Sequence, residues 1–170
     1  SLHDALPIYR LITFGLDIRW RKAMINLVPK STNSMLDIAS GTMDVAIAMA
    51  KSRPHKLSII ALDMAETMLD IGLKKCQRLK IKTINKVVGD VHKLPFGSET
   101  FEAATVSFGI RNFEHLDQAF KETQRVLKRD GSFIILESCQ PHNFIMRFLN
   151  GIYLNTWVRL MGILFSGHGD

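Results

Sequence analysis

Small and polar residues follow two apolar stretches of this chain at the points where each stretch ends. Gly41 and Thr42 lie just after the first stretch, and Asp63 ends the second one, 22 residues after Gly41. A carboxylate at this distance from a glycine loop can accept two hydrogen bonds from a ribose diol, which no apolar side chain can do. The spacing therefore predicts a pocket for an adenosine-containing ligand. The alternatives are a plain strand-to-helix turn at Gly41 with Asp37 or Asp44 as its cap, and a helix cap at Asp63.

Two further apolar stretches also end in polar residues. Asp90 follows the third stretch, where a carboxylate can reach an adenine amino group while Val91 offers a backbone contact and apolar cover. A turn aspartate is the alternative interpretation. Ser107 ends the fourth stretch. Because parallel strands end at the same edge of a sheet, we expect Asp90 and Ser107 to converge with Thr42 and Asp63 around a single adenosyl group.

The segment Gly109-Ile-Arg-Asn112 follows Ser107 and adds a cation to the predicted pocket. A partly buried guanidinium needs a partner, so Arg111 is either a group that does chemistry or one side of an ion pair with a carboxylate. His92 is a weaker candidate, as a proton acceptor, because most loop histidines are solvated. The sequence contains no catalytic-triad spacing, phosphate loop or paired-histidine motif, and we expect no metal site.

The elements that must position these residues alternate along the chain. Runs with the pattern of buried strands are 35–39, 57–62, 83–88, 101–108 and 132–137. Runs with helical periodicity are 11–28, 43–52, 64–80 and 116–127, and a turn signal lies at 129–131. This alternation predicts an α/β fold with a Rossmann-like, doubly wound parallel sheet, because each strand then buries both faces under helices.

Length and composition fit one domain. The chain has 170 residues, of which 46% are hydrophobic, so we expect a single domain over residues 1–170. Residues 1–8 show no clear periodicity and are interpreted as non-native, and residues 167–170 cap no recognisable element, which predicts a C-terminal truncation. Cys76 and Cys139 form no disulfide framework or ligand pattern, which is typical of a cytoplasmic compartment.

The net charge and the last apolar stretch indicate which partners the chain could bind. The net charge is +6, and basic residues between 74 and 86 crowd a predicted helix end, which favours a solvated face over a nucleic-acid site. Residues 142–165 are apolar but contain Arg147 and Arg159, which excludes a transmembrane span. We expect an amphipathic helix there, packed on the domain or on a second copy of the chain, or acting as a substrate lid or lipid contact.

With these residues in view, the chain resembles the ubiquinone/menaquinone biosynthesis C-methyltransferases, a family of class I S-adenosylmethionine-dependent enzymes. The run Val106-Ser-Phe-Gly-Ile-Arg-Asn112 is the most specific match, since many methyltransferases share the glycine loop and few share this run. The other matching stretches, in family order, are 11–21, 36–42, 89–90 with 94–96, and 125–131. The resemblance implies the class I methyltransferase fold with further strands after residue 170, so that the chain is a fragment.

The resemblance implies S-adenosylmethionine as the cofactor. Met43 stands where the family usually has Gly, at the loop that approaches this molecule. The positions that match the family's cofactor site are Gly41, which shapes the loop, and Thr42, Asp63, Asp90, Val91 and Ser107.

The resemblance also implies methyl transfer to a ring carbon of a polyprenylated hydroquinone, either demethylmenaquinol or 2-polyprenyl-6-methoxy-benzoquinol. Arg111 and Asn112 are the predicted catalytic residues, because a cation beside a phenolic oxygen lowers the pKa of that phenol. The alternatives are a class I methyltransferase for another small or lipidic acceptor and a non-catalytic nucleotide-binding module. A greasy acceptor implies a cytoplasmic protein in peripheral contact with the inner face of the membrane, without nucleic acid. A homodimer is left open.

Overall fold

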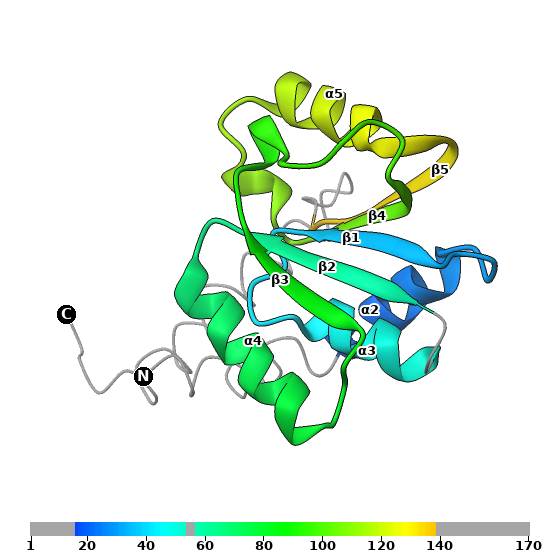
Figure 1. The fold of residues 1–170 in the computed structure, drawn as a ribbon, viewed down its shortest axis with the longest axis vertical. Helices are drawn as coiled ribbons and strands as arrows, with labels where there is room; N and C mark the ends of the chain where they lie inside the picture. Colours follow the sequence, from blue (N-terminus) through cyan, green and yellow to red (C-terminus); the bar gives the residue numbers. More distant parts are fainter. Residues whose placement is uncertain (1–15, 54–56, 139–170) are drawn as a thin grey trace, which may run out of the picture. The chain divides into compact units, whose positions relative to one another are not determined.

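A five-stranded parallel sheet forms the centre of the protein. The computed structural model describes residues 16–53 and 57–138. Its strands are β1 (Ser34–Ile38), β2 (Ser58–Asp63), β3 (Ile84–Val88), β4 (Phe101–Ser107) and β5 (Leu127–Leu136). They lie in the order β3-β2-β1-β4-β5, and every neighbouring pair is parallel (Figure 1). The predicted Rossmann-like sheet is therefore confirmed.

Helices cover both faces of the sheet. They are α2 (Leu16–Leu27), α3 (Asp44–Ser52), α4 (Glu66–Arg78) and α5 (Leu116–Val126), with the single turns η1 (Val91–Lys93) and η2 (Ile110–Asn112). In Figure 1, α3 and α4 lie on one face of the sheet and α5 lies on the other. The helices predicted over 43–52, 64–80 and 116–127 are confirmed with shorter bounds. The first part of the helix predicted over 11–28 lies outside the described residues.

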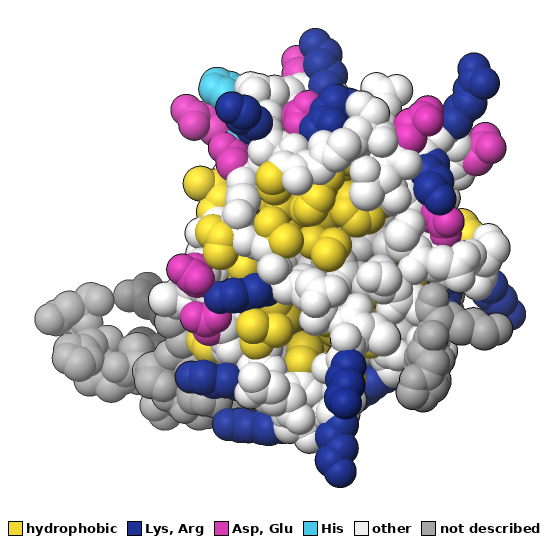
Figure 2. Space-filling view, viewed as in Figure 1, with side chains coloured by type: hydrophobic (Ala, Val, Ile, Leu, Met, Phe, Trp, Pro, Cys, Tyr) yellow, Lys and Arg dark blue, Asp and Glu magenta, His cyan; other side chains and the backbone are white. Residues whose placement is uncertain are grey.

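The strands divide their side chains between two apolar clusters. On β1, Met35 packs into the cluster with α3 and α4, whereas Leu36 and Ile38 pack into the cluster with α5. All three side chains are at most 1% exposed. Burial on both faces explains why the strands are continuous apolar runs in the sequence. On the face seen in Figure 2, apolar side chains gather in the middle and charged side chains of both signs surround them.

The last described strand differs from its prediction. The turn signal at 129–131 predicts a strand that begins at Ser132, but β5 begins at Leu127. Leu127 pairs with Phe101, and Ser132 pairs with Ala103, so residues 128–131 bulge out opposite the single residue Glu102. The turn residues are thus accommodated as a large irregularity inside one strand instead of ending it.

Residues 21–137 form a compact unit that contains every strand of the sheet. A second unit, residues 1–20 and 138–170, lies almost entirely outside the described residues, so the single-domain interpretation stays a prediction. The apolar segment at 142–165 and the opening residues 1–8 lie outside the described part as well. Within the described ranges, no helix has the length and apolar character that a bilayer span requires.

Candidate functional site

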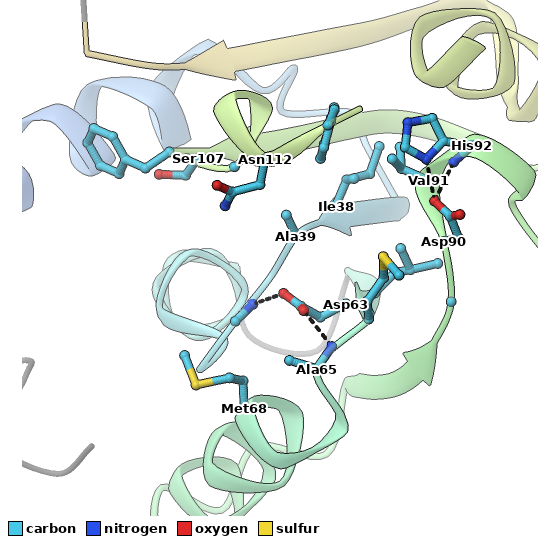
Figure 3. A pocket seen from close by; sticks show the side chains of 17 residues that line it. Ile38, Ala39, Asp63, Ala65, Met68, Asp90, Val91, His92, Ser107 and Asn112 are labelled. Atoms are coloured by element: carbon cyan, nitrogen blue, oxygen red, sulfur yellow. Dashed lines mark hydrogen bonds and ion pairs between the residues drawn. The ribbon is translucent and has the colours of Figure 1, made fainter. Parts of the chain in front are cut away.

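A cavity of about 440 Å³ opens at the carboxyl ends of β1 to β4 (Figure 3). The chain reverses its direction of travel across the sheet between β1 and β4, and this switch point is where open α/β sheets leave a crevice for ligands. The volume is that of a small-molecule site. Of the predicted site residues, the cavity is lined by Gly41, Asp63, Asp90, Val91, Ser107 and Asn112.

Asp63 holds the loop that follows β1. Its Oδ2 accepts the backbone N–H of Gly41 at 2.8 Å, and its Oδ1 accepts the backbone N–H of Ala65 at 2.9 Å (Figure 3). Gly41 has a φ of +53°, a conformation that side chains with a Cβ rarely adopt. Each carboxylate oxygen keeps a second lone pair for a ligand, so the loop-holding role and the predicted ribose-binding role of Asp63 are compatible.

Thr42 supports the loop from behind the cavity. Its hydroxyl lies 2.7 Å from Lys75 Nζ and 3.1 Å from Asp44 Oδ2, and Lys75 Nζ is also 2.9 Å from Asp44 Oδ1. Arg21 of α2 adds a second cation, 3.4 Å from Asp44 Oδ2. Thr42 is not among the residues that line the cavity, and its predicted contact with the cofactor stays a prediction.

Met43, which stands where the family usually has Gly, has a left-handed backbone, with a φ of 63°. Its side chain is fully buried and packs against Gly72 of α4, where an added Cβ would lie only 2.5 Å from Met43 Cγ. Met43 is also absent from the cavity lining. The chain therefore accommodates the methionine by having a glycine in the facing helix, and the departure from the family pattern leaves the cavity side of the loop open.

Asp90 and His92 form the next part of the rim. Asp90 Oδ1 accepts the backbone N–H of His92 at 2.9 Å and lies 2.6 Å from Nδ1 of the His92 ring (Figure 3). The backbone bond, more than the ring, holds the pKa of Asp90 below its ordinary value, so the carboxylate is charged at neutral pH. Val91, between them, is buried and lines the cavity.

Residues 107–115 form the opposite wall, and we call them the acceptor-side loop because they include the predicted catalytic residues Arg111 and Asn112. Ser107 Oγ is buried, and no hydrogen-bond partner for it lies among the described residues. A buried hydroxyl on a cavity wall without a partner is a natural contact for a polar ligand. Gly109 lets this loop approach β1 closely, since a Cβ there would lie 2.6 Å from Ala39 Cβ. Asn112 lines the cavity beyond it (Figure 3).

The side chain of Arg111 contacts Glu137 and does not line the cavity. Its guanidinium forms an ion pair with Glu137, just after β5, and its side chain is 53% exposed. Arg111 is not among the residues that line the cavity. The carboxylate pairing that the sequence left as an alternative is thus present, and a role for Arg111 toward an acceptor stays a prediction.

One buried acid was missed as part of the site. Asp37 of β1 accepts the hydroxyls of Ser40 at 2.6 Å and Thr105 at 2.7 Å. Burial is the largest influence on this carboxyl and raises its pKa to about 6. The sequence suggested Asp37 only as a cap of the turn, although an acid inside an apolar strand was the signal of a buried group. Within the described ranges, no group of three or more His, Cys, Asp or Glu side chains could hold a metal.

The comparisons with known proteins agree with this geometry. The profile of the ubiE/COQ5 methyltransferase family matches residues 6–170. The chain is 41% identical to a demethylmenaquinone methyltransferase of Thermotoga maritima, over 93% of this chain and 67% of that protein. It is 33% identical to a ubiquinone/menaquinone biosynthesis C-methyltransferase UbiE of Geotalea uraniireducens, over 92% of this chain and 68% of that protein. The chain therefore spans about two thirds of these relatives.

A solved structure of a methyltransferase has a similar fold. The structure of a SAM-dependent methyltransferase from Aquifex aeolicus superimposes with a TM-score of 0.60 at 18% identity, covering 72% of this chain and 69% of that one. The residues of the cavity fit S-adenosylmethionine, because they offer two rim carboxylates, an unpartnered buried hydroxyl and a glycine loop beside apolar walls. The predicted class I fold, methyltransferase activity and cofactor are confirmed, and the chain belongs to the ubiE/COQ5 methyltransferase family.

Proposed function

We propose that this chain methylates a ring carbon of a polyprenylated hydroquinone, demethylmenaquinol or 2-polyprenyl-6-methoxy-benzoquinol, in the synthesis of respiratory quinones. The observation that carries the proposal is that Asn112 lines the same cavity as Asp63 and Asp90. Groups suited to the cofactor and a group suited to the acceptor therefore face one space. The names of the relatives from Thermotoga maritima and Geotalea uraniireducens support the quinone class of acceptor.

The two sides of the cavity would bind different substrates. On the cofactor side, Asp63 would accept the ribose hydroxyls, Asp90 the adenine amino group, and Val91 would cover the base. Ser107 Oγ has a free hydrogen-bonding capacity for the same molecule. On the acceptor side, Phe108 and Phe113 give the wall an apolar surface suited to an aromatic ring.

When bound, S-adenosylmethionine supplies an electrophilic methyl group on its sulfonium. Asn112 would hold a hydroxyl oxygen of the acceptor, and Arg111 would lower the pKa of that phenol if it turns from Glu137 toward the cavity. Loss of the hydroxyl proton to water makes the neighbouring ring carbon nucleophilic, and the carbon takes the methyl group as the S–CH3 bond breaks and leaves S-adenosylhomocysteine. The carbon then loses its own proton, and the ring oxygen takes a proton back from water. Alignment of the reacting atoms by the cavity walls would supply most of the acceleration.

Variants of the acceptor-side loop in the full-length protein test this function. Arg111→Ala and Asn112→Ala should lower kcat with a quinol acceptor at least tenfold and change the Kd for S-adenosylhomocysteine less than threefold. Arg129→Ala is the matched control, because Arg129 is an exposed arginine at the opposite edge of the sheet. Equal losses in kcat and in cofactor affinity would assign both residues a structural role.

Parallel assays with different acceptors decide the substrate class. Turnover of demethylmenaquinol or of the benzoquinol supports the proposal. Turnover of only a sterol-like or simple phenolic acceptor would move the chain to a different substrate class. Calorimetry that shows no binding of S-adenosylhomocysteine to well-folded protein would favour the non-catalytic module.

A lipid-tailed acceptor also leads us to propose peripheral contact with the inner face of the membrane. The supporting observation is the net charge of +6, which attracts a protein to anionic lipid. Flotation with vesicles containing anionic lipid tests it, with neutral vesicles as the control. Protein that stays at the bottom of the gradient with both kinds of vesicle would contradict membrane contact.

A further inference from the structure

We propose that His92 is a positioning residue that ties the acceptor-side loop to the cofactor-side carboxylate of Asp90. The inference rests on the proposed function for the roles of these two sides. His92 lies between β3 and β4 in the sequence, and its side chain lines the cavity between the two walls (Figure 3). Its side chain is only 15% exposed. A ring in this place contacts both walls, so a shift of one wall would move the other.

Both ring nitrogens of His92 have partners on different walls. Nδ1 lies 2.6 Å from Asp90 Oδ1, and Nε2 lies 3.2 Å from the backbone nitrogen of His115. The carbonyl oxygen of His92 also accepts the side-chain amide of Gln118, at the start of α5, at 3.0 Å. The residue therefore joins the end of β3 to both the acceptor-side loop and the helix that follows it.

A single protonation form of His92 satisfies both ring bonds. The backbone N–H of His115 can only donate, so Nε2 must present its lone pair. The ring proton is then on Nδ1, where it is donated to Asp90. This form leaves no free nitrogen to take a proton from an acceptor. The geometry therefore favours a positioning role over the proton acceptor suggested by the sequence.

Ring contacts strengthen the same connection. The His92 ring meets Phe113 edge to face, with centroids 6.3 Å apart, and meets His115 in the same way at 5.9 Å. Phe113 lines the cavity and directly follows Asn112. A displaced His92 ring would therefore loosen the segment that carries the predicted acceptor-binding residues.

Two substitutions separate the two halves of this connection. His92→Asn puts an amide at the place of Nδ1 and can still donate to Asp90, but has no atom at the place of Nε2. His92→Gln puts an amide oxygen near the place of Nε2 and can still accept the His115 N–H, but has nothing at Nδ1. His92→Ala removes both partners. Glu114→Ala is the control, because Glu114 lies in the same loop and its side chain is 85% exposed.

The two readouts are amide hydrogen exchange of residues 107–115 and the Kd for S-adenosylhomocysteine from calorimetry. We expect His92→Asn to speed exchange at the His115 amide about tenfold and to change the Kd less than twofold. We expect His92→Gln to keep that amide protected and to weaken S-adenosylhomocysteine binding about fivefold. His92→Ala should show both effects, and the Glu114→Ala control should show neither.

Equal effects of the Asn and Gln variants on both readouts would assign His92 a merely structural role and overturn the inference. Unchanged exchange at His115 in His92→Asn would overturn it too. Neither readout uses a methyl acceptor. A chain that binds S-adenosylhomocysteine and shows the crossed pattern, yet methylates no quinol, would contradict the proposed function and leave the role of His92 intact.

Discussion

The cofactor side and the acceptor side of the cavity differ in how far their polar groups are already bonded. On the cofactor side, Asp63 holds two backbone N–H groups and Asp90 holds His92. On the acceptor-side loop, the Ser107 hydroxyl, which is predicted to contact the cofactor, has no partner among the described residues, and the side chain of Arg111 is bonded to Glu137. The carboxylates of the cofactor side hold the protein's own backbone, whereas the loop opposite presents a hydroxyl with hydrogen-bonding capacity to spare.

This difference suits a two-substrate site. The bond from Asp63 to the loop at Gly41 reduces the conformational entropy lost on cofactor binding, since it holds the loop in one conformation. An acceptor side with unused donors and acceptors gains hydrogen bonds when ligands arrive. A change that disorders the cofactor side without weakening cofactor binding would contradict this difference between the two sides.

Asp63→Ala should have the largest effect. The change removes the acceptor of two backbone N–H groups together with the predicted ribose contact. Hydrogen bonds to a charged group contribute about 1.5–3 kcal/mol each, so we expect affinity for S-adenosylhomocysteine to fall several hundred-fold, about 3–4 kcal/mol. Isothermal calorimetry measures the loss, and Asp63→Asn, which keeps one acceptor oxygen, should lose less. Unchanged affinity in the alanine variant would mean that the cofactor side is not where the molecule binds.

Asp37 connects the two sides, because Ser40 lies on the cofactor loop and Thr105 on β4. Burial raises the pKa of Asp37 from 3.8 to about 6, so the folded protein keeps a proton that the unfolded chain releases. The stability from this group is complete below pH 3.8 and is lost as the pH rises through about 6, by about 3 kcal/mol.

Urea denaturation of the native protein and of Asp37→Asn, at pH 4, 5 and 7, measures this dependence. The free energy of unfolding of the native protein, relative to the variant, should fall between pH 4 and pH 7, because asparagine does not titrate. A difference that is constant over this range would show that Asp37 is ionised throughout and that the two sides are joined by a charged group.

The contact between Met43 and Gly72 supports the cofactor loop from the core of the protein. Gly72→Ala places a Cβ against Met43 Cγ and should cost about 1–2 kcal/mol of stability, after the helix propensity gained by alanine. In the Met43→Gly background the same change should stabilise by up to about 1 kcal/mol. Chemical denaturation of the four proteins gives the coupling energy, and additive effects would contradict direct packing.

Gly41→Ala should have the smallest effect of the four. The residue has positive φ and an open cavity side, with Met68 Cε 3.9 Å from an added Cβ. Backbone strain of about 1 kcal/mol should weaken S-adenosylhomocysteine binding about fivefold. Gly97→Ala is the control, since Gly97 has no positive φ and an added Cβ meets only Thr100 Oγ1 at 3.7 Å. Equal effects of the two changes in a binding titration would remove the special role of Gly41.

The sequence predicted the sheet and most of the cofactor side for a physical reason. Strands buried on both faces are continuous apolar runs, and a parallel sheet brings the ends of those runs to one edge. Asp63, Asp90 and Ser107 therefore came together as their positions at strand ends indicated. For these three residues, their spacing along the chain was enough to predict that they lie close together.

Spacing was insufficient where the direction of a side chain decides its role. Thr42 and Gly41 are neighbours, yet only Gly41 lines the cavity, because Thr42 turns to Lys75 across 33 residues of sequence. The fit of Met43 against Gly72 and the ion pair of Arg111 with Glu137 are contacts between separate elements. Periodicity within one element carries no information about such pairs.

A crystal structure of this chain with S-adenosylhomocysteine would show where the cofactor binds. We predict the ribose hydroxyls at Asp63, the adenine between Asp90 and Val91, and a hydrogen bond to Ser107 Oγ. We also predict that the 2.8 Å bond from the Gly41 N–H to Asp63 is present in the complex. Ligand bound on another face, or a complex in which this bond is broken, would contradict a cofactor loop held by Asp63.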